Sequence, residues 1–329
     1  MSENSILVLG SSNTDMIIKM DRIPKPGETI LGGEFVSAAG GKGANQAVSA
    51  ARAGGSVTFI ARVGKDIFGD KAVAGFVADG INVDYVFRDS ASPSGVALIF
   101  VAKDGENSIA VASGANAKLF PADVTRAKDA FSDAMVLLLQ LETPLETVQA
   151  AAELAAGNGV RVILNPAPAR ELPDALLKNI YLLTPNESEM ELLTGIAVND
   201  EIAANAAAHP LLARGVQNVI LTMGARGAFV AGQNVRQLVP AFKAAAVDCT
   251  GAGDIFNGAL AVALAEGKSL LDAARFANAA AAISVSRLGA QTSAPTRKEI
   301  EQQLGGDSQF LNGVKKDMPR ASAESRAQL

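Results

Sequence analysis

The chain has 329 residues, of which 49% are hydrophobic and 19% charged, with a net charge of −5 and a pI of about 5.1. This length is enough for a large hydrophobic core in one α/β domain or in two smaller domains. The acidic balance argues against nucleic acid as the main partner, so any anionic ligand would need local hydrogen-bond donors.

Cysteine and histidine are almost absent. The single cysteine, Cys249, excludes an internal disulfide and fits a reducing compartment, and one cysteine with one histidine cannot form a zinc cluster. His209 lies in a polar Ala/Pro context, and we expect it at the surface. The N-terminus has no basic segment followed by an apolar run, and no apolar stretch approaches ~20 residues, so we expect a cytoplasmic protein with neither signal peptide nor membrane span.

The first predicted strand is Ile6–Leu9, which ends at Gly10. Asn13 and Asp15 follow at its carboxyl end, where open α/β sheets bind ligands, so both are candidates for binding substrate hydroxyl groups. A simple Asn/Asp turn is the alternative. Residues 16–38 contain short strand-like runs around Pro and Gly turns, which predicts a small β excursion that could close over the site as a lid.

A Gly-rich loop precedes the first predicted helix. Gly40-Gly41-Lys42-Gly43 runs into an Ala-rich helix that extends to about Ala53, without the spacing of a Walker A loop. Lys42 and Asn45 are polar in an otherwise bland segment and suit hydrogen bonds to a polyol. A solvated lysine and an Asn at a helix start are the alternative.

A hairpin further along extends the predicted lid. It follows a strand at Val57–Ile60 and an amphipathic helix at Phe68–Asp79, and it joins Val96–Val101 to Ser108–Ala112 through the turn Asp104-Gly105. Because a small exposed sheet with alternating apolar residues invites pairing with a second copy, we expect a homodimer through the lid sheet.

From about residue 121 strands and helices alternate. Helices are expected at 120–129 and 145–156, and strands at 134–140, 160–165, 180–184 and 216–223. This rhythm predicts an α/β fold of three layers, with a mainly parallel central sheet between helices. Polar residues gather at the predicted carboxyl edge of the sheet, where such folds bind ligands: Asn13, Asp15, Glu142, Asn165, Asn186, Glu189, Thr222 and Asp254.

The C-terminal third contains two weaker signals. The stretch Thr222–Gly227 has two glycines after a strand and suits backbone contact with a nucleotide, although a tight hairpin explains it equally well. A helix at 272–285 carries Asn278 among small side chains, which suit close packing or an adenine ring. The last helix is expected to end at Leu304, and residues 305–329 are expected to form a disordered tail.

The most informative stretch is a Gly-rich turn between a predicted strand, Lys243–Val247, and a predicted helix, Ile255–Ala265. Gly251 and Gly253 leave the N–H groups at the helix start open to an anion, and Asp254 places a carboxylate on the same turn. Donors for developing charge beside a base are what phosphoryl transfer to a hydroxyl requires. An ordinary Gly-rich loop capped by an Asp is the alternative.

Six motifs in this order resemble those of the ribokinase branch of the ribokinase-like (PfkB) sugar kinases. They are GSSNTD at 10–15, GGKGAN at 40–45, NPAPAR at 165–170, TPNESE at 184–189, DCTGAGDIFN at 248–257, and the stretch 278–293. The resemblance implies a ribokinase-like kinase domain over residues 1–304, with lid segments at about 16–38 and 95–112. It also implies ATP-dependent phosphorylation of D-ribose at the 5-hydroxyl, with Mg²⁺ and an activating K⁺ as cofactors.

The resemblance also implies roles for single residues. Asp254 would be the base that takes the hydroxyl proton, and the backbone of Gly251, Ala252 and Gly253 would be the anion hole. The sugar hydroxyls would be held by Asn13, Asp15, Gly41, Lys42, Asn45 and Glu142. ATP would be held by Asn186, Thr222, Gly224, Arg226, Gly227 and Asn278. Mg²⁺ would be organised by Glu189 through water. K⁺ would be held, mostly through backbone oxygens, by Asp248, Thr250, Ser284, Arg287, Gly289 and Ser293.

Other functions stay open. The same chemistry could act on deoxyribose, another sugar or a nucleoside, and a catalytically silent sugar sensor could use the same fold. A dinucleotide oxidoreductase is disfavoured, because no G-x-G-x-x-G follows the first strand. Since Asp254 would lie at a helix N-terminus, we expect its pKa to be lowered. We expect Cys249 to be buried and inert; an accessible thiol in this loop would instead be open to modification.

Overall fold

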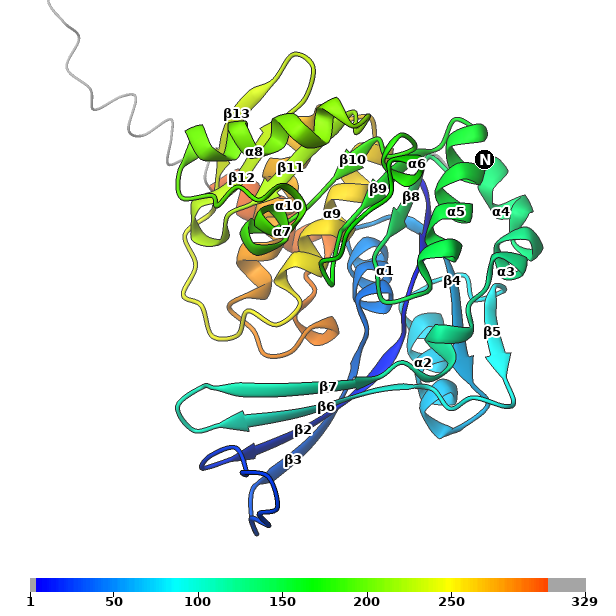
Figure 1. The fold of residues 1–329 in the computed structure, drawn as a ribbon, viewed down its shortest axis with the longest axis vertical. Helices are drawn as coiled ribbons and strands as arrows, with labels where there is room; N and C mark the ends of the chain where they lie inside the picture. Colours follow the sequence, from blue (N-terminus) through cyan, green and yellow to red (C-terminus); the bar gives the residue numbers. More distant parts are fainter. Residues whose placement is uncertain (1–3, 307–329) are drawn as a thin grey trace, which may run out of the picture.

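The computed structural model describes residues 4–306 of the chain, and its centre is a nine-stranded sheet (Figure 1). The strand order is β13-β12-β11-β10-β9-β8-β1-β4-β5. The strands are β1 (Ser5–Leu9), β4 (Ser56–Gly64), β5 (Val86–Asp89), β8 (Val136–Leu139), β9 (Arg161–Leu164), β10 (Leu182–Leu183), β11 (Asn218–Thr222), β12 (Gly227–Ala231) and β13 (Arg236–Pro240). All neighbouring pairs are parallel except β11–β12 and β12–β13, so the predicted, mainly parallel sheet is confirmed.

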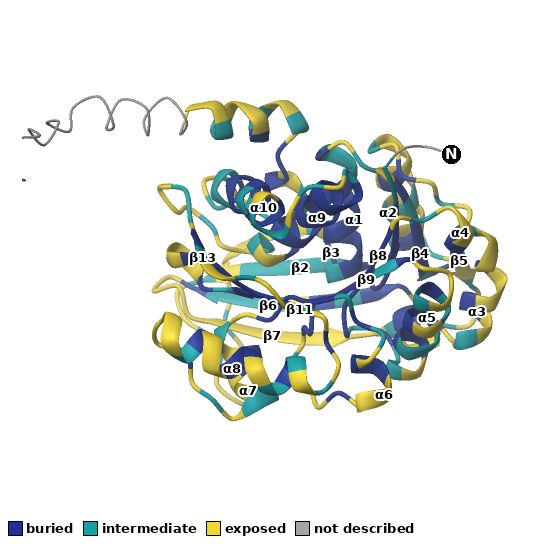
Figure 2. Cartoon of the chain, turned by 90° about the horizontal axis from the view of Figure 1, so that it is seen from above, coloured by how far each residue is buried: buried dark blue, intermediate teal, exposed yellow. Residues whose placement is uncertain are grey.

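Helices cover both faces of this sheet, as Figure 2 shows from above. One layer consists of α1 (Lys42–Arg52), α2 (Ile67–Ala78), α9 (Ala252–Ala265) and α10 (Leu270–Ser284), followed by a last helix at 297–306. The opposite layer consists of α3 (Pro121–Arg126), α4 (Lys128–Ser132), α5 (Leu145–Gly157), α6 (Asp174–Leu177), α7 (Glu187–Thr194) and α8 (Glu201–Ala213). The predicted three-layer architecture is therefore confirmed.

The apolar run of β1 explains why the sheet is buried on both sides. Ile6 and Val8 pack into the core under α1 and α9, whereas Leu7 and Leu9 pack into the core under α3–α8. Successive side chains of a strand point to opposite faces, so a continuous apolar run is typical of a strand between two helical layers.

A second, four-stranded sheet projects from the body and is called the lid sheet below (Figure 1). Its order is β3-β2-β6-β7, with β2 (Asn13–Met20), β3 (Glu34–Gly40), β6 (Gly95–Ala102) and β7 (Asn107–Ala112). The chain enters it directly from β1, so the first residues of β2 lie beside the carboxyl end of the central sheet. The predicted 96–101/108–112 hairpin is present as β6 and β7.

Several predicted boundaries differ from the structure. The strand predicted at Lys243–Val247 is wrong: this segment is exposed and irregular, because the sheet already ends at β13 and the backbone N–H of Val247 donates instead to Val285 O at the end of α10. The helix predicted at 120–129 is divided at Ala127, whose ψ of 10° departs from helical geometry.

Four further sequence predictions concern the last helix, the tail after it, membrane-spanning segments and His209. The last helix continues to residue 306, two residues beyond its predicted end. The rest of the predicted disordered tail, 307–329, lies outside the described residues. No helix within residues 4–306 is both long and apolar enough to cross a bilayer. His209 is exposed, as predicted.

Candidate active site

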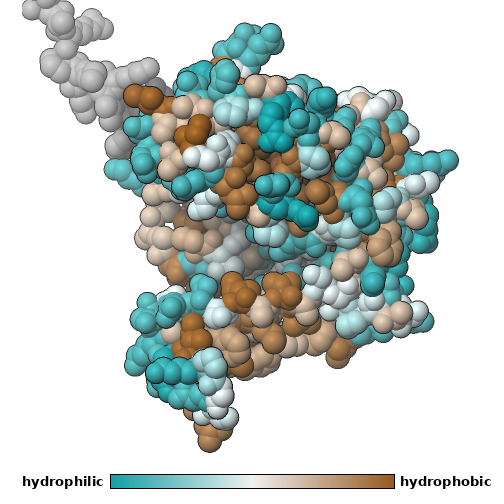
Figure 3. Space-filling view, viewed as in Figure 1, coloured by the Kyte–Doolittle hydropathy of each residue, from teal (hydrophilic) through white to brown (hydrophobic). Residues whose placement is uncertain are grey.

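The predicted catalytic and sugar-binding residues meet at the carboxyl edge of the central sheet. Strands β1, β8, β9 and β10 are parallel and in register, with Leu9 beside Leu139, Leu139 beside Leu164, and Leu164 beside Leu183. The loops after these strands, the start of β2, the N-terminus of α1 and the N-terminus of α9 therefore converge. Figure 3 shows a hollow at this edge, between the body and the lid sheet.

Asp254 is a buried, hydrogen-bonded side chain at this edge. It is the third residue of α9, after the N-cap Gly251, and only 5% of it is exposed. Asn45 Nδ2 donates to its Oδ2 at 3.0 Å, and Gln46 Nε2 donates to its Oδ1 at 2.9 Å. Gln46 is not among the predicted site residues, although a large amide inside an Ala-rich helix is itself a signal.

The predicted lowering of the Asp254 pKa is wrong. Burial raises the pKa of Asp254; the charge of Lys42 and the hydrogen bonds from Asn45 and Gln46 oppose this rise, and the charge of Glu142 adds to it. A helix N-terminus stabilises a nearby charge by ~0.3–1 kcal/mol, whereas full burial can move a carboxyl pKa by up to about 3–5 units. Desolvation therefore outweighs the helix dipole at this position.

Three carboxylates share the sugar side of the site: Asp15, Glu142 and Asp254. Burial, together with repulsion from Glu142 and Asp254, raises the pKa of Asp15 to about 6. The backbone N–H of Lys42 donates to Glu142 Oε2 at 3.0 Å, and the hydroxyl of Ser11 donates to the same oxygen. Such a cluster needs donors from a ligand, and a polyol supplies several.

Asn13 and Asn45 are both buried at this site. Asn13 Oδ1 accepts from Asn116 Nδ2 at 2.7 Å, and Asn116 also pairs with the backbone of Ser12 in both directions. Asn116 was not predicted, and only its place in the short 3-10 helix (Gly114–Lys118) after the lid hairpin could have indicated it. Within residues 4–306 the buried Asn45 Oδ1 has no hydrogen-bond partner, which leaves an acceptor for a ligand hydroxyl.

The N-terminus of α9 has room for an anion. Gly251 has a φ of 73°, and the N–H of Ala252 donates to Cys249 O at 3.2 Å, which closes the turn. A Cβ on Gly253 would meet no atom within 4 Å outside the local helix backbone of the described residues. Of the three predicted anion-hole groups, Ala252 is thus already paired, whereas the approach to Gly253 is open.

Five of the six predicted ATP-binding residues lie at the end of β11 or in the segments that follow β10 and β11: Asn186, Thr222, Gly224, Arg226 and Gly227. Asn186 forms a β-bridge with Thr222, and Gly227 must be glycine because its φ is 111° and a Cβ would collide with the carbonyl of Val239. The Arg226 guanidinium instead contacts Glu187 and the carbonyl of Asn199.

Asn278, the sixth predicted ATP-binding residue, contacts the end of β13. It lies on α10, and its Nδ2 donates to Val239 O and Pro240 O at 3.0 and 3.2 Å. Its amide thus ties α10 to the end of β13.

Glu189 caps the N-terminus of α7 together with Asn186. Its Oε2 accepts from the N–H of Asn186 at 2.8 Å, while Asn186 Oδ1 accepts from the N–H of Glu189 at 2.8 Å, which is a capping box. Burial raises the pKa of Glu189, whereas the Asn186 hydrogen bond and the Lys42 charge oppose the rise. Within residues 4–306 there is no group of three or more His, Cys, Asp or Glu side chains that could hold a metal ion.

The two segments predicted to hold K⁺ lie side by side. Asp248 accepts from the N–H of Thr250 at 2.9 Å and from the N–H of Gly289 at 2.8 Å. Although burial opposes it, these hydrogen bonds hold the pKa of Asp248 below its ordinary value, so an anionic group lies between the segments. The Arg287 guanidinium pairs with Glu299, which neutralises the cation next to this loop.

Two serines complete the predicted K⁺ set, and the loop also carries the only cysteine. The hydroxyls of Ser284 and Ser293 donate to the carbonyls of Ala281 and Ala290, so they are already used within the chain. Cys249 is exposed, and the prediction of a buried, inert cysteine is wrong. Residues 243–247, which precede Cys249, are exposed and do not form the predicted strand, so Cys249 is not buried beside the sheet.

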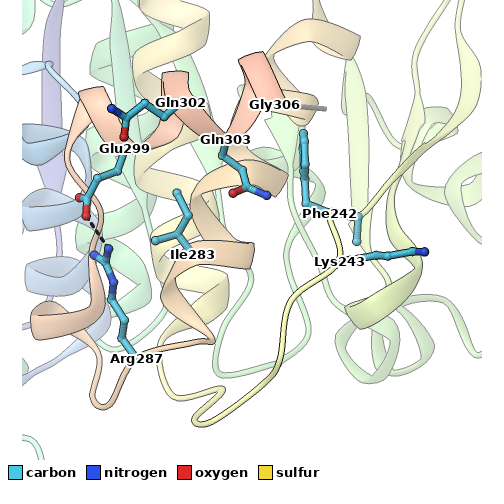
Figure 4. Close-up of a pocket in the computed structure, with 9 residues that line it drawn as sticks. Phe242, Lys243, Ile283, Arg287, Glu299, Gln302, Gln303 and Gly306 are labelled. Carbon is cyan, nitrogen blue, oxygen red and sulfur yellow. Dashed lines mark hydrogen bonds and ion pairs between the residues drawn. The ribbon is translucent and has the colours of Figure 1, made fainter. Parts of the chain in front are cut away.

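A cavity of about 620 Å³ lies behind this loop, between residues 241–243, α10 and the last helix (Figure 4). It is lined by Ala241, Phe242, Lys243, Ile283, Arg287, Glu299, Gln302, Gln303 and Gly306. None of the predicted catalytic or sugar-binding residues lines it.

Replacing Asp15 by Asn should stabilise the ligand-free protein. The pKa of Asp15 is about 6 in the folded protein and near 4 in the unfolded chain. Between about pH 4 and about pH 6 the folded state therefore binds more protons than the unfolded state. The contribution of Asp15 to stability falls as the pH rises through this range. We expect Asp15→Asn to raise the free energy of unfolding by about 1–2 kcal/mol at about pH 7.5, with the difference vanishing at about pH 4.

Urea unfolding at both pH values measures this effect. Asp21→Asn, an exposed carboxylate beyond the other end of β2, is the matched control and should stay within about 0.5 kcal/mol of the parent protein. If Asp15→Asn were no more stable than the parent protein at the higher pH, burial of the ionised Asp15 would not destabilise the folded state, and the prediction would be wrong.

Comparison with known proteins identifies the family. The model of the pfkB family carbohydrate kinases matches residues 3–297. The ribokinase of Haemophilus influenzae is 46% identical over 300 residues, which cover 91% of this chain and 98% of that protein. A deoxyribokinase of Salmonella typhi is 40% identical, also over 91% of this chain and 98% of its own length.

A solved structure agrees with these relatives. The ribokinase of Arabidopsis thaliana, complexed with ribose and ATP, has a TM-score of 0.87 and 35% identity, with coverage of 92% of this chain and 98% of that one. The family match spans nearly all the described residues, and the resemblance inferred from the motifs is confirmed. The chain belongs to the pfkB family of carbohydrate kinases.

Proposed function

We propose that this protein transfers the γ-phosphoryl group of ATP to the 5-hydroxyl of D-ribose and so forms D-ribose 5-phosphate and ADP. The observation that carries this proposal is the placement of Asp254, a buried carboxylate on the first turn of α9 beside the open approach to Gly253. A base and an anion-binding helix start on one turn suit transfer of a phosphoryl group to a hydroxyl. The relatives named ribokinase support ribose as the acceptor.

Asp254 is proposed as the base. Its carboxylate accepts the proton of the 5-hydroxyl as that oxygen bonds to the γ-phosphorus and the bond to the ADP oxygen breaks. The N–H groups of Gly251 and Gly253 stabilise the charge that develops on the transferred group, and closure of the lid sheet keeps competing water out. Lys42 favours the ionised form of Asp254, which the reaction needs.

The remaining predicted residues bind the two substrates and the ions. Asn13, Asp15, Gly41, Lys42, Asn45 and Glu142 are proposed for ribose, and Asn186, Thr222, Gly224, Arg226, Gly227 and Asn278 for ATP. Glu189 is proposed to orient Mg²⁺ through water; the ion would neutralise phosphate charge. Asp248 and the backbone oxygens of Thr250, Ser284, Arg287, Gly289 and Ser293 are proposed for K⁺, which would order the loop before α9.

The test is ADP release from ATP and Mg²⁺ with D-ribose, 2-deoxyribose, fructose or adenosine, each in potassium and in a bulky organic cation. Turnover that requires ribose and falls without potassium is the expected result. The 40% identical deoxyribokinase favours 2-deoxyribose as the second candidate, and a higher kcat/KM for that sugar would move the assignment to it. Binding of ATP without turnover on any acceptor would reject the kinase in favour of a sensor.

The lid sheet is proposed to mediate a homodimer. Side chains alternate between the two faces along β2, so Met16 and Ile18 point to the face opposite Asp15, which interacts with the site. Paired residues of neighbouring strands share a face. The register places Leu98 beside Met16 and Phe35 beside Ile18, on the side away from the site. Leu98 and Phe35 are 46% and 61% exposed, and a second copy would cover them.

Leu98→Asp should therefore convert the protein to a monomer. Light scattering should give twice 33.7 kDa for the parent protein and one chain mass for the variant, because a charge on the covered face opposes association. Ile202→Asp, an equally drastic change at a residue that is 82% exposed on α8, is the control and should stay dimeric. A monomeric parent protein, or a dimeric Leu98→Asp variant, would reject this interface.

We place the activity in the cytoplasm, where ATP is available and an exposed thiol such as Cys249 stays reduced. Cell fractionation with an antibody to the chain tests this, and recovery in a secreted or membrane fraction would contradict it.

A further inference from the structure

A continuous series of buried amide and hydroxyl groups runs beneath the proposed base. It contains Gln140, Gln46, Asn165, Thr184 and Asn257, and is called the amide chain below. These residues come from the end of β8, from α1, from the loops after β9 and β10, and from α9. They are between 0% and 7% exposed, so their hydrogen bonds cannot be exchanged freely for water.

The first half of the amide chain ends on Asp254. Gln140 Nε2 donates to Gln46 Oε1 at 2.6 Å, which fixes Gln46 with its Nε2 on the far side. That nitrogen donates one hydrogen bond to Asp254 Oδ1 at 2.9 Å and another to Asn165 Oδ1 at 3.1 Å. A primary amide has two N–H groups, so both are used.

The second half ends on the backbone of the same helix turn. Asn165 Nδ2 donates to Thr184 O at 3.1 Å, and Thr184 Oγ1 donates to Asn257 Oδ1 at 2.6 Å. Asn257 Nδ2 then donates to Gly253 O at 2.8 Å. One series of hydrogen bonds therefore holds both the carboxylate of Asp254 and the peptide that follows Gly253.

We propose that Gln46 is a positioning residue for Asp254, and that the amide chain orients the base and the anion-binding turn of α9 as one unit. Gln46 donates to Oδ1 and Asn45 donates to Oδ2, both from α1, so each carboxylate oxygen keeps a lone pair for the substrate hydroxyl. Gln140 sets the orientation of Gln46 from behind and does not touch Asp254. This inference rests on the proposed function, since it concerns how the base is held.

The electrostatic surroundings of Asp254 give this inference a distinctive readout. Lys42 is the nearby cation, and Glu142, Asp15 and Glu189 are the nearby carboxylates that interact with Asp254. The hydrogen bond from Gln46 favours the ionised carboxylate against burial. Loss of that donor should raise the pKa of Asp254, so the acidic limb of the kcat profile should move to higher pH.

The main variants are Gln46→Met, which keeps length without a donor, and Gln46→Glu, which keeps shape but puts an oxygen in place of the nitrogen. For each, we expect kcat to fall about ten- to hundredfold, because a misplaced base loses much of its effect. The acidic limb should rise by about one pH unit in Gln46→Met, the scale of one hydrogen bond to a charged group, and by more in Gln46→Glu, whose carboxyl group adds a like charge beside Asp254. KM for ribose and for ATP should stay within about threefold, because Gln46 is 0% exposed and therefore not open to either substrate.

Ser49→Ala is the matched control. Ser49 lies on the same helix, is 2% exposed, and its Oγ donates to Ile255 O at 2.9 Å, so it also joins α1 to α9 without touching Asp254. We expect a lower melting temperature but an unchanged kcat and acidic limb. If the Gln46 variants behave like Ser49→Ala, the amide is only structural and the inference is wrong.

Gln140→Met provides a second, more distant perturbation. It removes the donor to Gln46 Oε1, so it should shift the limb in the same direction by a smaller amount. If the Gln46 variants do not fold, the pH profile of kcat for Gln140→Met is the deciding measurement, and an acidic limb at the same pH as in the parent protein overturns the inference. Failure of the proposed function is separate, because it would appear as absence of ribose-dependent ADP release in the parent protein.

Discussion

Asp254→Asn is expected to lower kcat for ribose phosphorylation by roughly 10²–10⁴-fold, the usual contribution of a positioned general base, while ribose and ATP still bind. The change removes the ability to accept a proton and leaves the shape of the side chain almost unchanged. Rapid-quench measurement of one turnover, together with calorimetric titration of each substrate, would separate the chemical step from binding.

The surroundings of Asp254 can accept this substitution. An Asn at 254 accepts through one oxygen only, so Gln46 can keep its hydrogen bond to that oxygen. Asn45 can turn its amide over, because its Oδ1 is buried without a partner in the described residues and would then accept from the new Nδ2. We therefore attribute the expected loss to proton transfer and not to a damaged site.

Asp272→Asn is the matched control for this change. Asp272 is the third residue of α10, as Asp254 is the third residue of α9, but it is exposed and caps its own helix with Ser269. Its replacement should alter kcat by less than about twofold. An Asp254→Asn variant with near-normal turnover would remove Asp254 from the role of base.

The fold could be predicted from the sequence because its main signals are local. The uninterrupted apolar run Ile6–Leu9 indicates a strand buried on both faces, and all four side chains are buried. The alternation of strands and helices from residue 121 favours a parallel sheet, and β1 and β8 are parallel. The placement of Asn13, Asp15 and Glu142 at one edge follows from this topology, since β1 and β8 are parallel strands that end on the same side.

Other features depend on tertiary contacts that the sequence does not encode locally. Lys243–Val247 has the apolar character of a strand, but within residues 4–306 its backbone does not pair with the sheet; the N–H of Val247 donates to Val285 O at the end of α10. The sign of the Asp254 pKa shift depends on how deeply α1 and α9 bury the carboxyl group, which no spacing indicates. Asn186 and Glu189 match a capping box as well as a family motif, so their spacing alone does not separate the two.

Gly251→Ala is expected to reduce kcat by at least about 10²-fold, because it disturbs the turn that presents the Gly251 and Gly253 N–H groups to the phosphoryl group. Gly251 has a φ of 73°, which is unfavourable for alanine. A Cβ there would also lie 2.7 Å from the Cβ of the buried Ala290, too close for either residue to stay in place. The turn must therefore move, and Asp254 moves with it.

Gly267→Ala separates the backbone effect from the contact effect. Gly267 follows the other end of α9 with a φ of 78°, and a Cβ there would have no neighbour within 4 Å among the described residues. Both variants should lose about 1–2 kcal/mol of stability from the backbone conformation, but only Gly251→Ala should lose turnover. Because Ala290 adjoins Gly289, which bonds to Asp248, the Gly251 variant should also respond less to potassium. If both variants kept full kcat, the N-terminus of α9 would not be the anion hole, and phosphoryl stabilisation would have to come from side chains such as Lys42.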